Sequence, residues 1–209
     1  IKYTSDLKFP GMLYGKVLRS PHAHAKILSI DYSKAERLPG VVAVITADDV
    51  PNNKGIIGLT IADCGVLAKD KARYVGDAVA AVAAVSEEIA EDALGLIDVK
   101  YEVLPAVFDP EEAMKPDAPQ VHEGYDNPKY HGHGNIASIR RVIKGDVEKG
   151  FKEADYIVED RFSTQLLDQT PMERETYIAA FEPGGTLTVW AKTQAPYWER
   201  VILSRALKI

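Results

Sequence analysis

Residues 78–103 read AVAAVAAVSEEIAEDALGLIDVKYEV, and this stretch decides the fold class. Its first eight residues, 78–85, are all apolar, as in a strand buried on both faces. Ser86 then fits a helix N-cap, and the acidic residues that follow suit the positive end of a helix dipole. Apolar residues recur at helical spacing up to Ile97, and residues 98–103 return to the alternation of a strand. The stretch therefore predicts strand, helix and strand, and with them a mixed α/β fold.

The residues before this stretch predict more short strands. Alternating or β-branched runs favour strands over 12–18, 26–31 and 41–46. Ser33 and Glu36 have the spacing of a capping box, which predicts a short helix that begins at Ser33. A carboxylate introduced at Ala81, in the middle of the apolar run, is expected to unfold this first domain.

The composition changes after residue 108. Residues 109–135 are rich in Pro and Gly and are expected to form a linker over the surface. Regular patterns then resume and predict an α+β segment. It comprises a helix over 147–154, a long strand over 156–166, a hairpin of strands over 176–182 and 186–191, and a helix over 196–207.

Composition and charge exclude several classes of protein. The 209 residues are 46% hydrophobic, enough to bury a core, and the net charge of −6 lacks the basic character of a nucleic-acid binder. The single cysteine excludes an internal disulfide and a Cys-based zinc site. No apolar run is long enough to span a membrane and no signal peptide opens the chain, so a cytoplasmic location is expected. Neither end resembles a natural terminus, which predicts a piece of a longer polypeptide.

Few side chains suggest chemistry by themselves. Two histidine pairs, His22/His24 and His131/His133, could each bind a metal ion if they lay on one face of a strand. No further Cys or His near either pair in the sequence completes a set of ligands. We expect hydrogen-bonding histidines and no metal site. Cys64 lies in a Gly-rich loop with no evident base beside it, so no catalytic nucleophile is expected.

A series of short motifs runs along essentially the whole chain. The strings are PGMLY (10–14), RSPHAHA (19–25), LPGV (38–41), VITADDVP (44–51), RYVG (73–76), VKYEVLP (99–105), GDV (145–147) and TQAP (193–196). Each motif is weak alone, but in this order the series resembles the start of the molybdenum subunit of the xanthine dehydrogenase and aldehyde oxidase family.

The resemblance implies a domain organisation. Residues 1–123 resemble the family's a/b hammerhead domain, residues 124–142 form a Pro/Gly-rich linker, and residues 143–209 resemble the opening segment of an α+β molybdopterin-binding domain. It also implies a molybdopterin dinucleotide with molybdenum in the full subunit. The [2Fe–2S] clusters and FAD are expected on partner chains or domains.

The implied function is that of the N-terminal part of a molybdenum-dependent oxidoreductase. Such an enzyme oxidises an N-heterocycle, an aldehyde or a related aromatic with oxygen from water. The expected partners are the rest of the molybdenum subunit, iron–sulfur and FAD subunits, and a small-molecule substrate. This stretch alone is expected to be inactive, and the alternative is a non-catalytic module for docking or cofactor loading.

One residue of the expected site can be transferred by resemblance. Gln194 matches the family glutamine whose amide approaches an oxo ligand of molybdenum, so it is expected to contact the cofactor. The alternative is that Gln194 caps the helix that begins at Pro196. The family's Gly-Gly-Phe-Gly loop and general-base glutamate would lie beyond residue 209, so no catalytic residue and no metal ligand are assigned.

Overall fold

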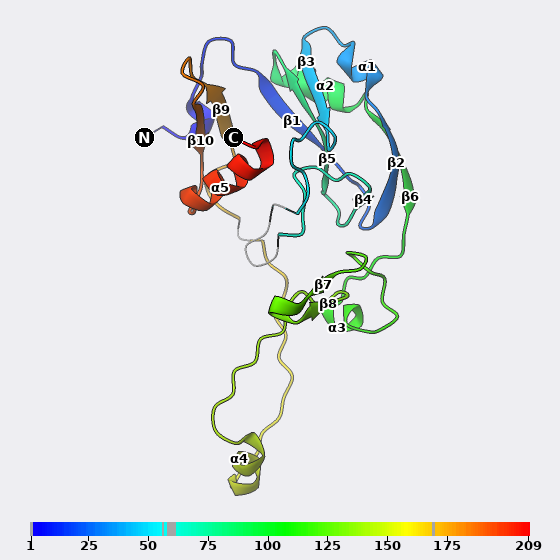
Figure 1. Cartoon of the computed structure of the whole chain (residues 1–209), viewed down its shortest axis with the longest axis vertical. Coiled ribbons are helices and arrows are strands. Elements are labelled where there is room, and N and C mark those ends of the chain that lie inside the picture. The colour runs from blue at the N-terminus through cyan, green and yellow to red at the C-terminus, as the bar shows by residue number, and fades with distance from the viewer. Residues whose placement is uncertain (1, 56, 58–61, 169) are drawn as a thin grey trace.

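The computed structural model describes residues 2–55, 57, 62–168 and 170–209. The first half of the chain forms two small sheets with a helix packed on one of them; an extended arm follows in the sequence and projects away, and the terminal hairpin and helix lie beside the first half (Figure 1). The elements of the first half are η1 (Thr4–Asp6), β1 (Tyr14–Arg19), β2 (Ala25–Asp31), α1 (Ser33–Glu36), β3 (Val41–Thr46), β4 (Lys71–Ala72), β5 (Ala78–Ala84), α2 (Glu87–Leu94) and β6 (Asp98–Val103).

The apolar run of the sequence becomes the central strand of the first sheet. The order is β1-β5-β3, and both neighbours are antiparallel to β5. Val79, Ala80, Val82 and Ala84 are buried, whereas Ala81 is only half-buried. The strand is therefore not buried on both faces along its length. The unfolding expected from a carboxylate at Ala81 stays a prediction, and the fully buried alanine in the middle of the strand is Ala80.

Helix α2 covers this sheet and closes the main core. The Ser86 side chain accepts a hydrogen bond from the Ile89 N–H at 3.2 Å, which confirms the predicted N-cap. Ala93 and Ile97 pack with residues of β3, β5 and α1 in one cluster of buried apolar side chains. Helix α1 begins at Ser33 as predicted, but Ser33 is its first residue and does not cap it: the N-cap is Tyr32, which makes no side-chain cap hydrogen bond.

The second sheet has the order β4-β2-β6, and its pairings are also antiparallel. Strands β5 and β6, which flank α2 in the sequence, therefore lie in different sheets. The mixed α/β fold class is confirmed, but the strand–helix–strand unit does not place its two strands side by side.

The Pro- and Gly-rich stretch folds back on the second sheet. It contains α3 (Pro110–Ala113), β7 (Asp126–Asn127), η2 (Pro128–Tyr130) and β8 (Gly132–His133). The Lys71 ammonium, whose side chain is 6% exposed, donates to the Gln120 carbonyl at 3.2 Å and pairs with Glu123 at 2.5 Å. The Asn135 amide bridges two carbonyls of the same stretch. The expected linker 124–142 thus includes short regular elements, while the domain limits stay a prediction.

The remaining elements are α4 (Val147–Glu153), β9 (Tyr177–Phe181), β10 (Leu187–Ala191) and α5 (Pro196–Leu207). The hairpin β9–β10 and helix α5 confirm the predictions for the end of the chain. Both contact the first half: the rings of Phe9 and Trp190 lie 4.8 Å apart. In addition, the Asn52 N–H donates to the Ala206 carbonyl in the last turn of α5 at 2.9 Å.

The prediction of a strand over residues 156–166 is wrong, because this stretch has no paired neighbour among the described residues. In the part of the chain that the structure describes, the helices are too short or too polar to cross a membrane.

Candidate functional site

Gln194 lies in the turn that joins β10 to α5. The Thr193 hydroxyl oxygen accepts a hydrogen bond from the Ala195 N–H at 2.9 Å, which closes the turn. Ala195 is the N-cap of α5, and Pro196 occupies the first helical turn, where a missing N–H costs nothing. The Gln194 side chain is exposed and makes no hydrogen bond with the described residues. The alternative that Gln194 caps α5 is therefore wrong, and its amide stands open at the tip of the turn.

An ion pair holds the strand that leads into this turn. The Lys192 ammonium contacts the Glu175 carboxylate, and the Tyr177 hydroxyl donates to the same carboxylate at 3.2 Å. The hydrogen bond from Lys192 holds the pKa of Glu175 below its usual value. The sequence analysis missed this pair, although the register of the hairpin, with Ala191 opposite Tyr177, brings the two side chains together.

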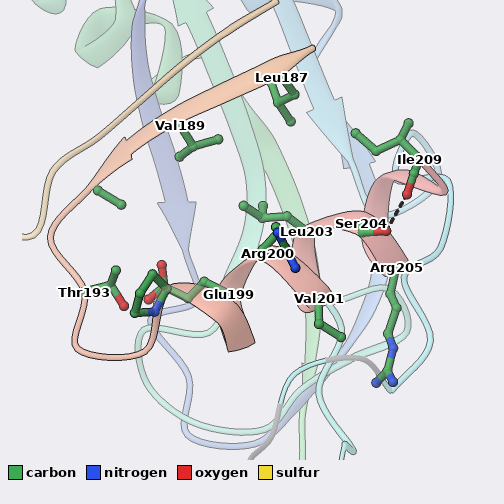
Figure 2. Close-up of a pocket in the computed structure, with 12 residues that line it drawn as sticks. Leu187, Val189, Thr193, Glu199, Arg200, Val201, Leu203, Ser204, Arg205 and Ile209 are labelled. Atoms are coloured by element: carbon green, nitrogen blue, oxygen red, sulfur yellow. Dashed lines mark hydrogen bonds between the residues drawn. The ribbon is translucent and has the colours of Figure 1, made fainter.

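A hollow of about 860 Å³ lies between β10 and α5, beside the turn. Figure 2 shows Leu187 and Val189 of the strand above the helix, with Thr193 at one end and Ile209 at the other. The lining is mainly apolar, and Arg200 and Glu199 bring charge to it. This volume is in the range of small-molecule pockets. The turn with Gln194 thus stands at the rim of a hollow large enough for a cofactor-sized group.

The turn fits a contact to a molybdenum–pterin group, but it does not form a complete cofactor site. A primary amide offers two donors and an acceptor, and here none of them is used within the described residues. Such an amide can orient a metal centre through hydrogen bonds without ligating the metal. In the described ranges no three His, Cys, Asp or Glu side chains come together in a way that could hold a metal ion.

The histidine pairs have structural surroundings. His24 is buried, and its Nδ1–H donates to the Pro105 carbonyl at 2.6 Å. The His22 ring meets Tyr101 edge-on, with 4.9 Å between ring centres. These contacts join the residues before β2 to β6 and its exit, and the expected side-chain hydrogen bond is found for His24. His131 ends η2 in the left-handed conformation.

One cluster that the sequence analysis missed surrounds Cys64. The Cys64 thiol donates to one oxygen of Asp63 at 3.4 Å, and the other oxygen lies 3.5 Å from His122 Nε2. Because the histidine is far away in the sequence, no local spacing could have indicated it. Burial raises the pKa of the thiol to about 11 and lowers the pKa of His122. Cys64 is thus protonated near neutral pH, and the cluster lacks an activated nucleophile.

Comparison with known proteins identifies the class. Residues 1–105 match the family model of the aldehyde oxidase and xanthine dehydrogenase a/b hammerhead domain, and residues 129–209 match that of the molybdopterin cofactor-binding domain. The chain belongs to the aldehyde oxidase and xanthine dehydrogenase family.

Individual relatives agree with this assignment. The chain is 45% identical, over its whole length, to a probable xanthine dehydrogenase subunit of Bacillus subtilis, of which it covers 27%. It is 37% identical, over 95% of its length, to the nicotinate dehydrogenase large molybdopterin subunit of Eubacterium barkeri, of which it covers 44%. The crystal structure of quinoline 2-oxidoreductase from Pseudomonas putida 86 superposes with a TM-score of 0.84 at 33% identity, over 99% of this chain and 26% of that one. The chain thus spans only part of the length of the relatives it matches.

Proposed function

We propose that this chain is the N-terminal part of the catalytic molybdenum subunit of a hydroxylase similar to xanthine dehydrogenase and aldehyde oxidase. The enzyme would oxidise an N-heterocycle, an aldehyde or a related aromatic with oxygen from water. The observation that carries the proposal is the succession of a hammerhead domain and a molybdopterin-binding domain in one chain of this length.

The chain's own contribution centres on the turn after β10. When bound, a molybdopterin dinucleotide with molybdenum supplies the two-electron oxidation of the substrate. Gln194 would hold and orient this group through its open amide, while Thr193 and the Lys192–Glu175 pair keep the turn in place. The proposed contact would only position the cofactor, and no proton transfer is assigned to Gln194.

The partners follow from the same proposal. Electrons would leave through [2Fe–2S] clusters and FAD on partner chains or domains, and the complex would work in the cytoplasm. Support comes from relatives that are themselves named as subunits, such as the 6-hydroxypseudooxynicotine dehydrogenase complex subunit gamma of Paenarthrobacter nicotinovorans. We propose further that the 209 residues alone do not turn over substrate.

Metal analysis of the native complex tests the proposal. A tagged chain is expressed in its native organism and purified with its complex. Molybdenum, iron and FAD are then measured per mole of chain. About one molybdenum, four iron and one FAD are expected, since two [2Fe–2S] clusters hold four iron atoms. A folded chain that purifies without molybdenum would instead support the docking or cofactor-loading module.

A variant of the turn tests the role of Gln194. We expect Gln194→Ala to lower kcat of the complex about 10- to 100-fold, as loss of a supporting hydrogen bond at a metal centre does. The control is Gln165→Ala, which removes another exposed amide away from the turn. Equal kcat values for the two variants would exclude the proposed contact.

A further inference from the structure

Asn52 connects the loop after β3 to the far end of α5. Its backbone N–H donates to the Ala206 carbonyl at 2.9 Å, and its side-chain Nδ2 donates to the Arg205 carbonyl at 3.0 Å. A helix leaves its last four carbonyls without partners inside the helix, and N–H donors suit the negative end of the helix dipole. Asn52 supplies two such donors, so a residue of the first half caps the C-terminus of α5.

The loop that carries Asn52 is itself fixed to the first half. Just before it, the Asp49 carboxylate accepts from the Thr46 N–H at 2.8 Å and from the Thr46 hydroxyl at 3.1 Å. Just after it, the Asn53 side-chain oxygen accepts from the Val66 N–H at 2.7 Å. Asn52 lies between these two anchored residues and therefore connects α5 to a fixed part of the first half.

The rest of α5 is held less firmly than the strand before it. A hollow of about 860 Å³ lies between α5 and β10, so the helix packs only incompletely on the strand. Among the described residues of α5, Ala206 alone is buried, and its carbonyl is one of the two that Asn52 binds. Strand β10, by contrast, is paired along its length with β9 and stacks Trp190 against Phe9. The contact with Asn52 is therefore the main restraint on the far end of α5.

The turn with Gln194 is the joint between these two elements. Residues 192–195 link β10 to α5, and this helix of 12 residues is about 18 Å long. Figure 2 shows Thr193 and Arg205 at opposite ends of the helix. If the far end is released, the helix pivots about the turn and changes the backbone angles there. The hydrogen bond from the Ala195 N–H to the Thr193 hydroxyl oxygen is then weakened, and the direction of Gln194 changes with it.

We propose that Asn52 is a positioning residue for Gln194: by capping α5, it fixes the turn from which the Gln194 amide reaches the cofactor. The inference rests on the proposed function. Asn52 itself does not contact the cofactor, and its effect passes through α5 and the turn. The string VITADDVP (44–51) then has a role in the site, because it forms the loop that leads to Asn52.

Hydrogen exchange on the native complex tests the link between Asn52 and the turn. In Asn52→Ala, the amides of residues 193–195 should exchange about fivefold faster than in the wild type, since the loss of one hydrogen bond shifts a local opening equilibrium by about this factor. The control is Lys54→Ala, at an exposed position of the same loop, which should leave these amides within about twofold. Wild-type exchange of the turn in Asn52→Ala, or faster exchange confined to residues 204–209, would overturn the proposal.

An isosteric variant separates the hydrogen bond from the bulk of the side chain. Asn52→Asp keeps the size of the side chain, but it replaces the donor with a carboxylate that the Arg205 carbonyl and the negative end of α5 repel. The amides of residues 193–195 should therefore exchange at least about fivefold faster than in the wild type. Wild-type exchange in Asn52→Asp would show that the donor is not needed and would refute the positioning role.

The electron paramagnetic resonance signal of Mo(V) reports on the cofactor in the same preparations. Dithionite reduces the complex, so the measurement needs no substrate. Asn52→Ala should shift the g values in the same direction as Gln194→Ala but by less, and it should cause no further shift in a Gln194→Ala background. An equal shift from Asn52→Ala in both backgrounds, or none in the wild-type background, would contradict an effect through Gln194. A complex without molybdenum would instead refute the proposed function, and hydrogen exchange would still decide whether Asn52 fixes the turn.

Discussion

The substitution Ala80→Asp tests the core of the first half most directly. Ala80 is 0% exposed and lies in the middle strand of the β1-β5-β3 sheet. Its cluster contains Val44, Val82 and Ile97, which offer no hydrogen-bond donor to a new carboxylate. The nearby Thr46 hydroxyl already donates to Asp49 at 3.1 Å. The introduced side chain would therefore be buried without a partner.

The loss of stability expected for Ala80→Asp has two parts. A buried carboxyl group without a hydrogen bond costs roughly 2–7 kcal/mol, even when it becomes neutral by taking up a proton. The added volume costs about 1–3 kcal/mol more in a filled core. We take about 4 kcal/mol as a conservative sum, which lowers Tm by about 8–16 °C for a chain of this size. Thermal unfolding followed by circular dichroism measures this shift.

The neighbouring residue supplies the control. Ala81 is half-buried on the other face of the same strand, so its carboxylate can reach water. Ala81→Asp should lower Tm by less than half as much as Ala80→Asp. If the two variants unfold at the same temperature, or if Ala80→Asp leaves Tm unchanged, the assignment of the faces of β5 is refuted.

Three further predictions concern a turn, a thiol and an ion pair. Gly40 has φ +95°, and a Cβ there would lie 2.7 Å from Ile89 Cδ1, so Gly40→Ala should cost about 1–3 kcal/mol in urea unfolding. Gly150→Ala, at a helical position with open space, should instead stabilise by about 0.5–1 kcal/mol. Cys64 should react with iodoacetamide at pH 8 about 100-fold more slowly than a thiol of ordinary pKa, because its pKa is raised from 9.0 to about 11; reaction at the ordinary rate would contradict this. Glu123→Gln should cost about 1 kcal/mol at neutral pH. The hydrogen bond from Lys71 lowers the pKa of Glu123, so the pair stabilises the fold above the usual carboxylate pKa. The difference in Tm from the wild type should vanish as the pH falls through the lowered pKa, and a difference that persists in acid would exclude the pair as its cause.

Local patterns in the sequence were enough for most elements. The apolar run at Ala78 predicts a strand, the Ser86 cap predicts a helix start, and both are confirmed, as is the hairpin of β9 and β10. The motif series also sufficed for the family, because many short strings in one order are specific even where each is not. Gln194 is a candidate through its motif alone, and its exposed amide could be seen only in the structure.

Periodicity determines which face of a segment is apolar, and therefore that a strand or helix is favoured. It carries no information about the partner, since pairing and burial depend on residues far away in the sequence. Tertiary structure alone decided that β5 and β6 lie in different sheets, that Ala80 rather than Ala81 is buried, and that His122 lies beside Asp63. The same physics accounts for residues 156–166: their alternation is that of a strand, but backbone hydrogen bonds need a neighbour, and among the described residues there is none.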